Sequence, residues 1–514
     1  MTGVCAIAWT VSLGAADQAG RNVYGIHTDP QRSATLLHGT LGAKYVRVEI
    51  PWAVSDSRGG LLRFDTENDR NIAEIEAAGM RAFPTIIIGR GWMNGLTWPP
   101  ESNEPRSVPP GDLSTTLDPI TGYSPTYFTF LRDFVTHYRG HFDYVAIEHE
   151  IDNPQLWSGN ASEYLRLLKT ASMAIRSADP NAIVTHAGLS SGFWGLVIAK
   201  DWISRGLEST DDAVDFALRY LNSEQPVGSV PSQNQVKQTI EESLTRSTSE
   251  FNETQLPFVN SILDGISGSV DAINLHYHHD ARYLYIVAQW LHERASRAPS
   301  PYTPMILTND LGVIGTPDLG CSSADPFSAQ ELDGQARRLF KRLLAARTAR
   351  IEPIVVSSFE NVCRDTVVEP HHADLFDPTR PGELRPSGAS FRRFVDATSA
   401  MTDARAFSAG PELFAVWFDD TEGRQALLVA WSEVPGGQTM SLIVSRTFES
   451  AVVTDYAGNT STIPIANGDL RVTINATPVL IHLVPPATPP PPLGIESVSP
   501  PTGNTAGGTI VTIV

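Results

Sequence analysis

The chain has 514 residues, of which 41% are hydrophobic and 8% aromatic, and its formal net charge is −19 at pH 7. This length exceeds what one hydrophobic core usually supports, so we expect two or three domains. The ordinary hydrophobic content argues against a disordered chain. The negative charge argues against nucleic acid and anionic lipid as partners, because both bind through clustered Lys and Arg.

The N-terminal segment, residues 1–22, is apolar, rich in small residues and contains Ala15-Ala16 before an acidic residue. It resembles the hydrophobic part of a secretory signal, although no positive residue precedes it, and the alternative is a plain N-terminal strand. We interpret it as a possible signal remnant, which predicts a secreted or cell-surface protein. No apolar run is long enough to span a bilayer, so membrane insertion is not expected.

The sequence contains three cysteines, Cys5, Cys321 and Cys363. Three are too few for a disulfide scaffold. The last two either pair in an oxidising compartment or remain isolated thiols.

Residues 23–400 alternate between short apolar, β-branched runs and longer segments with helical periodicity, which indicates βαβ units and a parallel sheet. The candidate strands are Val23–His27, Tyr45–Ile50, Ala82–Ile88, Tyr144–Glu148, Ile183–Ala187, Ala272–Tyr277, Met305–Thr308 and Ile354–Ser358. The plainest helices are Asn71–Ala78, Tyr127–Tyr138, Ala161–Ala178 and Ala329–Ala346. Eight such units predict an α/β fold, the (β/α)₈ TIM barrel. A doubly wound sheet is the alternative, but no Gly-rich phosphate turn follows the first strand.

The sequence pattern changes after the barrel region. Residues 401–484 contain seven short strands separated by Gly, Asn and Asp turns, which predicts an antiparallel β-sandwich. Residues 485–493 are a Pro-rich, extended linker. Residues 494–514 resemble the opening of an immunoglobulin-like IPT/TIG domain and end too early to close a sandwich.

The fourth predicted strand ends in acidic residues, at the barrel face where TIM-barrel chemistry takes place. Glu148 and Glu150 are two apart and therefore point to the same side of a strand. A carboxyl group at the mouth that loses contact with water has a raised pKa and is suited to donate a proton, which cleavage of a glycosidic bond requires. The alternative role for Glu150 is a rim residue in an ion pair.

The context of this strand resembles a large clan of TIM-barrel glycosidases, the β-xylosidase-like and cellulase-like superfamily, whose catalytic carboxylates lie on strands four and seven. There an Asn-Glu-Pro is followed by Trp-x-Gly and by a helix that ends in Asp-Pro-Asn-Ala. Here Glu150 precedes Trp157-Ser158-Gly159 and Asp179-Pro180-Asn181-Ala182. The chain departs from the pattern in His149 for Asn, so His149 has to replace the usual hydrogen bond to the sugar 2-hydroxyl. The resemblance implies that Glu150 is the acid/base.

The seventh strand, Pro304-Met-Ile-Leu-Thr308-Asn309-Asp310, resembles the clan's strand with the nucleophilic Glu, and Asp310 holds the matching position. Asp is one methylene shorter than Glu. Retaining enzymes hold their carboxyl groups about 5–5.5 Å apart and inverting ones about 6.5–9.5 Å. Three interpretations follow: a retaining enzyme with an Asp nucleophile, an inverting enzyme with an Asp base, or an inactive site.

Other positions extend the resemblance. Arg47 and Trp52 match the clan's Arg and Trp on strand two, where the Arg is expected to bind the strand-seven carboxylate and keep it ionised. His276 and Tyr277 match a His-Tyr on strand six, where the Tyr contacts the nucleophile. A zinc site in this His cluster is not expected, because no metal-ligand spacing is present, and no cofactor is implied.

Aromatic side chains near strand ends are candidates for stacking on sugar rings. Five of the ten tryptophans follow predicted strands, and we expect them at the barrel mouth: Trp52, Trp92, Trp98, Trp157 and Trp194. Each one taken alone is more often a core residue.

The sequence therefore predicts a glycoside hydrolase that acts on an oligo- or polysaccharide, retaining, with Glu150 as acid/base and Asp310 as nucleophile. The alternative is a non-catalytic carbohydrate-binding or cell-surface protein on a degenerate glycosidase barrel. Transglycosylation on the same site is a third possibility. Fold alone does not decide between them.

Overall fold

The computed structural model describes residues 22–28, 37–52, 66–88, 107–154, 156–223, 238, 255–312, 328–358, 375–377, 380, 382–408, 413–422, 425–444, 448–484, 498–499 and 512–513. The chain divides into two compact units. The first comprises Met1–Ala406 and Phe418–Arg424, and the second comprises Phe407–Trp417 and Gln425–Val514.

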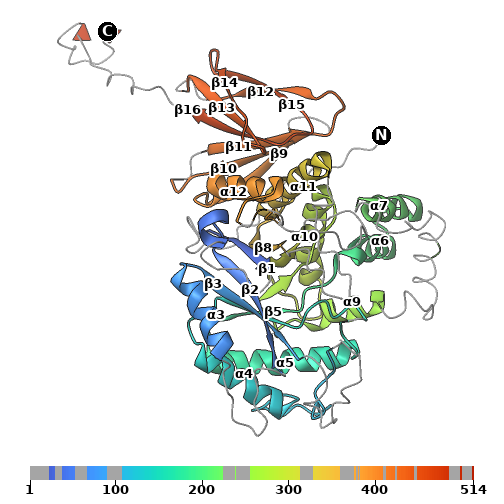
Figure 1. Ribbon diagram of the computed structural model, residues 1–514. Helices are drawn as coiled ribbons and strands as arrows, with labels where there is room; N and C mark the ends of the chain where they lie inside the picture. Colours follow the sequence, from blue (N-terminus) through green and yellow to red (C-terminus); the bar gives the residue numbers. More distant parts are fainter. Residues whose placement is uncertain are drawn as a thin grey trace, which may run out of the picture. The chain divides into compact units, whose positions relative to one another are not determined.

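Eight parallel strands of the first unit form a closed barrel in the order β1 to β8, in which β1 pairs with both β2 and β8 (Figure 1). The strands are β1 (Tyr24–Thr28), β2 (Tyr45–Pro51), β3 (Arg81–Ile87), β4 (Tyr144–Ile147), β5 (Ile183–His186), β6 (Ala272–Asn274), β7 (Met305–Leu311) and β8 (Ile351–Ser358). This confirms the predicted (β/α)₈ barrel and excludes the doubly wound alternative, in which the sheet would keep two open edges.

The helices connect consecutive strands and lie around the outside of the barrel (Figure 1). They are α3 (Thr66–Ala77), α4 (Pro125–His137), α5 (Ala161–Ala178), α6 (Trp194–Ser204), α7 (Thr210–Asn222), α9 (Gln255–Gly265), α10 (Ala281–Ser296), α11 (Ala329–Thr348) and α12 (Pro386–Thr398), with the short turns η1 (Leu37–Leu41) and η3 (Ser191–Phe193). Among the described residues, no helix combines the length and apolarity needed to cross a membrane.

The interior of the barrel is apolar in one layer and polar in the next. The apolar layer consists of inward-facing residues from six strands: Tyr45, Phe83, Tyr144, Ala146, Ala272, Leu307 and Val355. Because side chains alternate along a strand, the inward positions two residues further along lie closer to the C-terminal ends. On β2 and β3 these positions are Arg47 and Thr85, both buried and hydrogen-bonded to each other. The sequence therefore changes from hydrophobic to polar at the layer below the barrel mouth.

Helix α5 follows the loop that leaves β4, and a capping box fixes its first turn. The Asn160 side chain accepts from the Glu163 amide at 3.0 Å, and the Glu163 carboxylate accepts from the Asn160 amide at 2.7 Å. These contacts satisfy two backbone donors that a helix start otherwise leaves unpaired.

Replacing Asn160 with Ala is expected to lower the free energy of unfolding by about 1 kcal/mol, because the cap is lost while the helix keeps its buried face. Urea unfolding measures the change. Ser162→Ala, an exposed substitution in the same turn, serves as the control and is expected to change stability by less than about 0.5 kcal/mol. Equal effects of the two variants would contradict the capping role.

The predicted antiparallel β-sandwich lies mostly in the second unit, and the division between the units falls within its first two strands. One sheet has the order β14-β13-β16-β11-β10-β9 and a second pairs β12 with β15. The strands are β9 (Asp403–Ser408), β10 (Leu413–Asp419), β11 (Gln425–Ser432), β12 (Gln438–Ile443), β13 (Ser450–Asp455), β14 (Thr460–Pro464), β15 (Asp469–Ile474) and β16 (Val479–Val484). Residues of both sheets share one core, for example Met440 of β12 and Leu428 of β11. The two sheets therefore pack face to face.

Several predicted features lie wholly or largely outside the described residues. They include the signal segment, the three cysteines, the Pro-rich linker, Trp92 and Trp98. Of the predicted immunoglobulin-like segment the structure describes only the two-residue strands β17 (Val498–Ser499) and β18 (Thr512–Ile513), which pair with each other.

Candidate active site

Three consecutive polar side chains leave β4 and reach three different strands. Glu148 accepts a hydrogen bond from the amide of Ile88, just past β3, and His149 Nδ1 lies 2.7 Å from Arg47 Nη2 of β2. Glu150 lies 2.9 Å from His276, just past β6. The backbone departs from strand geometry to allow this, with φ of 70° at Glu148 and 40° at Glu150. Such angles in non-glycine residues are strained by roughly 1–3 kcal/mol each and concentrate at functional sites.

A bulge in β7 turns two neighbouring side chains into the barrel. Asn274 pairs with Leu307 and Tyr277 pairs with Leu311, so three residues after Asn274 correspond to four residues after Leu307. The pairing of β7 with β8 also shifts between Thr308 and Leu311. One extra residue therefore lies between Leu307 and Leu311. In a regular strand, adjacent side chains point to opposite faces, and a bulge removes that alternation.

Both residues at the bulge contact interior groups. Asn309 contacts Asn274 and Thr85, while Asp310 contacts Arg47 and Ser357. The bulge is thus the local reason that Asp310 reaches the barrel mouth.

Asp310 is surrounded by cationic and hydrogen-bonding groups. Arg47 Nη1 donates to Oδ2 at 3.1 Å, the Ser357 hydroxyl donates to Oδ1, and His278 Nε2 lies 3.4 Å from Oδ1. His27 Nδ1 lies 3.8 Å from Oδ2. Burial alone would raise the pKa of Asp310, but the contacts with His27 and His278 outweigh it and hold this pKa well below its usual value. Asp310 is therefore a carboxylate, and the predicted contact from Arg47 is confirmed.

Glu150 differs electrostatically from the sequence-based expectation. Burial acts to raise its pKa, as predicted, but the hydrogen bond with His276 and the nearby His149 lower the pKa to about 2. The charge of Asp310 also acts on the Glu150 carboxyl, so the two acids are near enough to interact. The sequence predicted the burial of Glu150, but it did not predict the contact with His276.

His149 is neutral and has a fixed orientation. The guanidinium of Arg47 is only a donor, so His149 Nδ1 accepts and the ring proton lies on Nε2. Burial, and then the charge of Arg47, lower the pKa of His149 to about 4. The ring can therefore donate from Nε2 but carries no charge near neutral pH.

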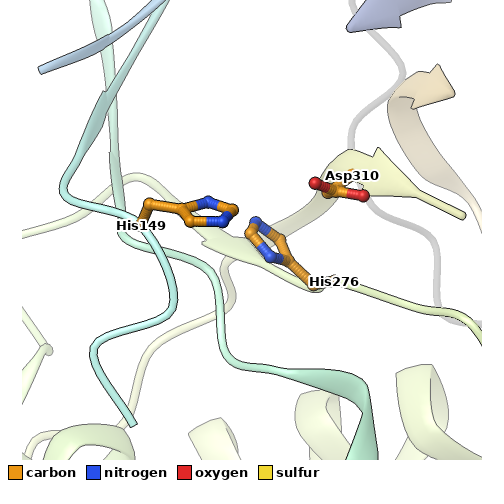
Figure 2. Close-up of side chains that lie close together, drawn as sticks. All are labelled: His149, His276 and Asp310. Atoms are coloured by element: carbon orange, nitrogen blue, oxygen red, sulfur yellow. The ribbon is translucent and has the colours of Figure 1, made fainter. Parts of the chain in front are cut away.

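Figure 2 shows His149, His276 and Asp310 converging from three different segments of the chain. One ligand atom from each lies within 4.8 Å of the others, a spacing that a metal ion would accept. Both ring nitrogens of His276 are already in hydrogen bonds, and the Arg47 guanidinium places a positive charge 3.1 Å from Asp310. We assign no metal to these three residues, because a cation would have to displace those contacts.

Glu148 is a buried acid next to the site. Burial raises the pKa of Glu148 from 4.5 to about 7, more than the hydrogen bonds with the Ile88 amide and Ser107 lower it. Between these two pH values the folded protein keeps a proton that the unfolded chain releases, so stability falls as the pH rises. Above about pH 7 the loss is complete.

The variant Glu148→Gln is expected to remove this pH dependence, because the amide stays neutral and its oxygen still accepts from Ile88. The wild type should lose about 3 kcal/mol relative to the variant between pH 4.5 and pH 7. Urea unfolding at a series of pH values measures the difference. Glu74→Gln, an exposed substitution on α3, is the control. A difference curve that stays flat would show that Glu148 is ionised throughout.

Several predicted site residues lie elsewhere than expected. Trp52, Trp157 and Trp194 are buried in the core instead of exposed at the mouth. Trp52 packs against Tyr127 and Phe130 of α4, and the burial of its ring there is favourable because apolar surface is removed from water.

Tyr277 also differs from its expected role. The phenol donates to the carbonyl of Asp280, and only the backbone amide of Tyr277 contacts Asp310, at its carbonyl oxygen. Burial of the ring in the cluster around Tyr220 accounts for this orientation.

The sequence reasoning assigned no role to five residues that complete the site: His27, Glu49, His278, Asn309 and Ser357. Each stands at or just beyond the C-terminal end of a predicted strand. This position at a strand end could have identified them as site residues, because the βα-loops carry the chemistry in this fold. Glu49 is the most exposed of the site's acids, with 43% of its side chain accessible, and it lies 3.3 Å from Arg47.

The sequence matches no known family model and no curated protein. Its fold is nonetheless similar to solved glycoside hydrolase structures. A family 39 glycoside hydrolase from the gut symbiont Bacteroides cellulosilyticus WH2 aligns with a TM-score of 0.58 at 13% identity, covering 90% of this chain and 81% of that one.

Two further structures align with a TM-score of 0.50 at 10% identity over 91% of this chain. One is a GH30 endoxylanase from Clostridium papyrosolvens C71, of which 98% is covered. The other is a glucosidase from Croceicoccus marinus, of which 96% is covered. At these identities the likeness establishes the fold, a TIM barrel with an antiparallel β-domain.

Proposed function

We propose that the protein is a retaining glycoside hydrolase that cleaves an O-glycosidic bond in an oligo- or polysaccharide. The observation that carries this proposal is the local distortion of the backbone at both carboxylates. Positive φ angles occur at Glu148 and Glu150 of the β4 end, and the β7 bulge occurs at Asp310. Strain retained at two such places in one barrel mouth is difficult to explain by stability alone.

Asp310 is suited to be the nucleophile. The surrounding histidines keep the pKa of Asp310 low, Arg47 donates a hydrogen bond to it, and a carboxylate is the species that attacks an anomeric carbon. The bulge turns the Asp310 side chain into the barrel toward Arg47, and a retaining geometry requires this turn to offset a side chain that is one methylene shorter than Glu. This supports a retaining geometry over an inverting one.

Glu150 is suited to be the acid/base because it lies at the barrel mouth just past β4 and has 17% of its side chain exposed. His149, whose Nε2 carries a proton, is positioned on the same loop to donate to a sugar hydroxyl. The solved glycoside hydrolases that share the fold are consistent with a saccharide substrate.

A panel of aryl glycosides and plant and microbial polysaccharides tests this function. The expected result is turnover of at least one substrate by the wild type, with a strong loss in Glu150→Gln on the substrates whose leaving groups are poor. Saturable glycan binding without any turnover would favour the alternative, a carbohydrate-binding protein on a glycosidase barrel.

A further inference from the structure

Two buried asparagines determine which atom of His276 carries a proton. The backbone amide of Asn309 donates to Asn274 Oδ1 at 3.1 Å, so the other side-chain atom of Asn274 is its NH₂ group. That group donates to Asn309 Oδ1 at 2.8 Å, which makes this atom an acceptor. The first hydrogen bond comes from a backbone N–H, which can only donate. The orientations of both side-chain amides are therefore fixed and cannot be flipped.

His276 Nε2 lies 2.8 Å from the same Asn309 Oδ1 and must therefore donate to it. A neutral imidazole has only one N–H, so Nδ1 of a neutral His276 would present a lone pair. The Glu150 carboxylate oxygen lies 2.9 Å from that Nδ1. Two lone pairs repel at this distance, and a proton must lie between the two atoms.

We propose that His276 is an imidazolium whose Nδ1 proton is the one that Glu150 delivers to the leaving group, so that the two side chains act as one proton donor and acceptor. This rests on the proposed glycosidase function. His276 contacts no reacting atom and acts through Glu150, which makes it a positioning residue for the acid/base.

The charges around the pair agree with a charged ring. Two carboxylates, Glu49 and Asp310, contact the single guanidinium of Arg47, so the surroundings of the pair are net negative and favour a cationic ring beside Glu150. Two other rings nearby, those of His149 and His186, are neutral. His149 accepts from Arg47, and burial lowers the pKa of His186 to about 3. A pKa of about 2 for Glu150 fits a carboxylate beside a charged partner.

The ring is held in place by close packing. Gly188 has φ of 76°, and a Cβ atom added there would lie 2.1 Å from His276 Nε2. His276 is fully buried, so its proton exchanges with the substrate through Glu150 and not directly with water.

The proton balance over two steps is complete. In the first step Asp310 forms a bond to the anomeric carbon, the C–O bond breaks, and its electron pair stays on the glycosidic oxygen. The Nδ1 proton of His276 passes to Glu150 as Glu150 delivers a proton to that oxygen, which leaves a carboxylate and a neutral ring. In the second step water attacks the anomeric carbon, its proton returns to the pair, and the bond to Asp310 breaks with its electrons returning to the carboxylate.

The direct test is ¹⁵N NMR of the full-length protein labelled at histidine nitrogens, near neutral pH. We expect both His276 nitrogens to be protonated in the wild type, with the signal assigned by its loss in His276→Gln. In Glu150→Gln, which keeps the ring, the Nδ1 proton is expected to be lost because its carboxylate partner is gone. A neutral His276 ring in the wild type overturns the proposal.

The pH profile of kcat/KM supplies the second readout. In His276→Gln the basic limb is expected to move to lower pH, because the Glu150 carboxyl then has to hold the proton without a histidine partner. The matched control is His141→Gln, which removes an exposed ring whose Nδ1 lies 2.8 Å from Glu76. A fall in kcat with an unmoved limb would indicate a merely structural role.

The two proposals fail separately. A charged His276 in a protein that hydrolyses no glycoside upholds the pair and rejects the function. A neutral His276 in an active enzyme rejects the pair and leaves the function intact.

Discussion

Replacing Asp310 with Asn is expected to lower kcat/KM by roughly 10⁴–10⁶-fold, because the nucleophile is lost while its surroundings persist. The amide oxygen still accepts from Arg47, but it cannot form the glycosyl intermediate. Kinetics with an aryl glycoside measures the effect. Asp396→Asn is the matched control, since this exposed Asp on α12 also binds an arginine, Arg392 at 2.7 Å. An Asp310→Asn variant within about tenfold of the wild type would remove Asp310 from the reaction.

Two further measurements test the role of Asp310. The product anomer, followed by ¹H NMR, is expected to retain the configuration of the substrate. Asp310→Glu gives the side-chain length that the clan resemblance implies at this position, yet we expect it to be about 10²-fold less active than the wild type. Asp310 already contacts Arg47 and Ser357, so a longer side chain would overshoot these partners. Full activity of Asp310→Glu would show that the bulge does not compensate.

The variant Glu150→Gln is expected to lose roughly 10²–10⁴-fold in kcat/KM on glycosides with poor leaving groups. The loss should be far smaller for the first step with activated aryl leaving groups, which depart without a proton. Comparing substrates of graded leaving-group pKa under steady-state and burst conditions separates these cases. Glu76→Gln is the matched control, because Glu76 also contacts a histidine, His141, but on the outer surface. A uniform loss across all leaving groups would contradict the acid role.

Much of the fold was predictable because the barrel depends on periodicity. Alternating apolar runs and helical segments indicated all eight strands, and Gly- and Asn-rich turns indicated the sandwich. Tyr45 and Arg47 of β2 show how one strand encodes both the apolar layer and the polar one. Strand lengths were less predictable, since β6 ends at Asn274 and continues only as isolated bridges.

The sequence predicted several residues of the candidate site, but it did not predict the pKa of Glu150. The positions of Glu150, Asp310 and Arg47 followed from strand ends and from the glycosidase resemblance. The direction of the Glu150 pKa did not, because it depends on His276, which is 126 residues away in sequence. The prediction that the tryptophans lie at the barrel mouth was wrong for a related reason. A large ring after a strand suits an outer helix as well as a ligand, and Trp52 packs against α4.

The extra residue in β7 links the two halves of the proposed reaction. Asn309 and Asp310 share one insertion, so a single bulge orients both the histidine that we propose as the proton source and the carboxylate that we propose as the nucleophile. Shortening β7 by that residue would restore alternation and turn one of the two outward. A one-residue deletion in β7 is therefore expected to disturb the surroundings of His276 and of Arg47 together, whereas a substitution at either position changes one of them.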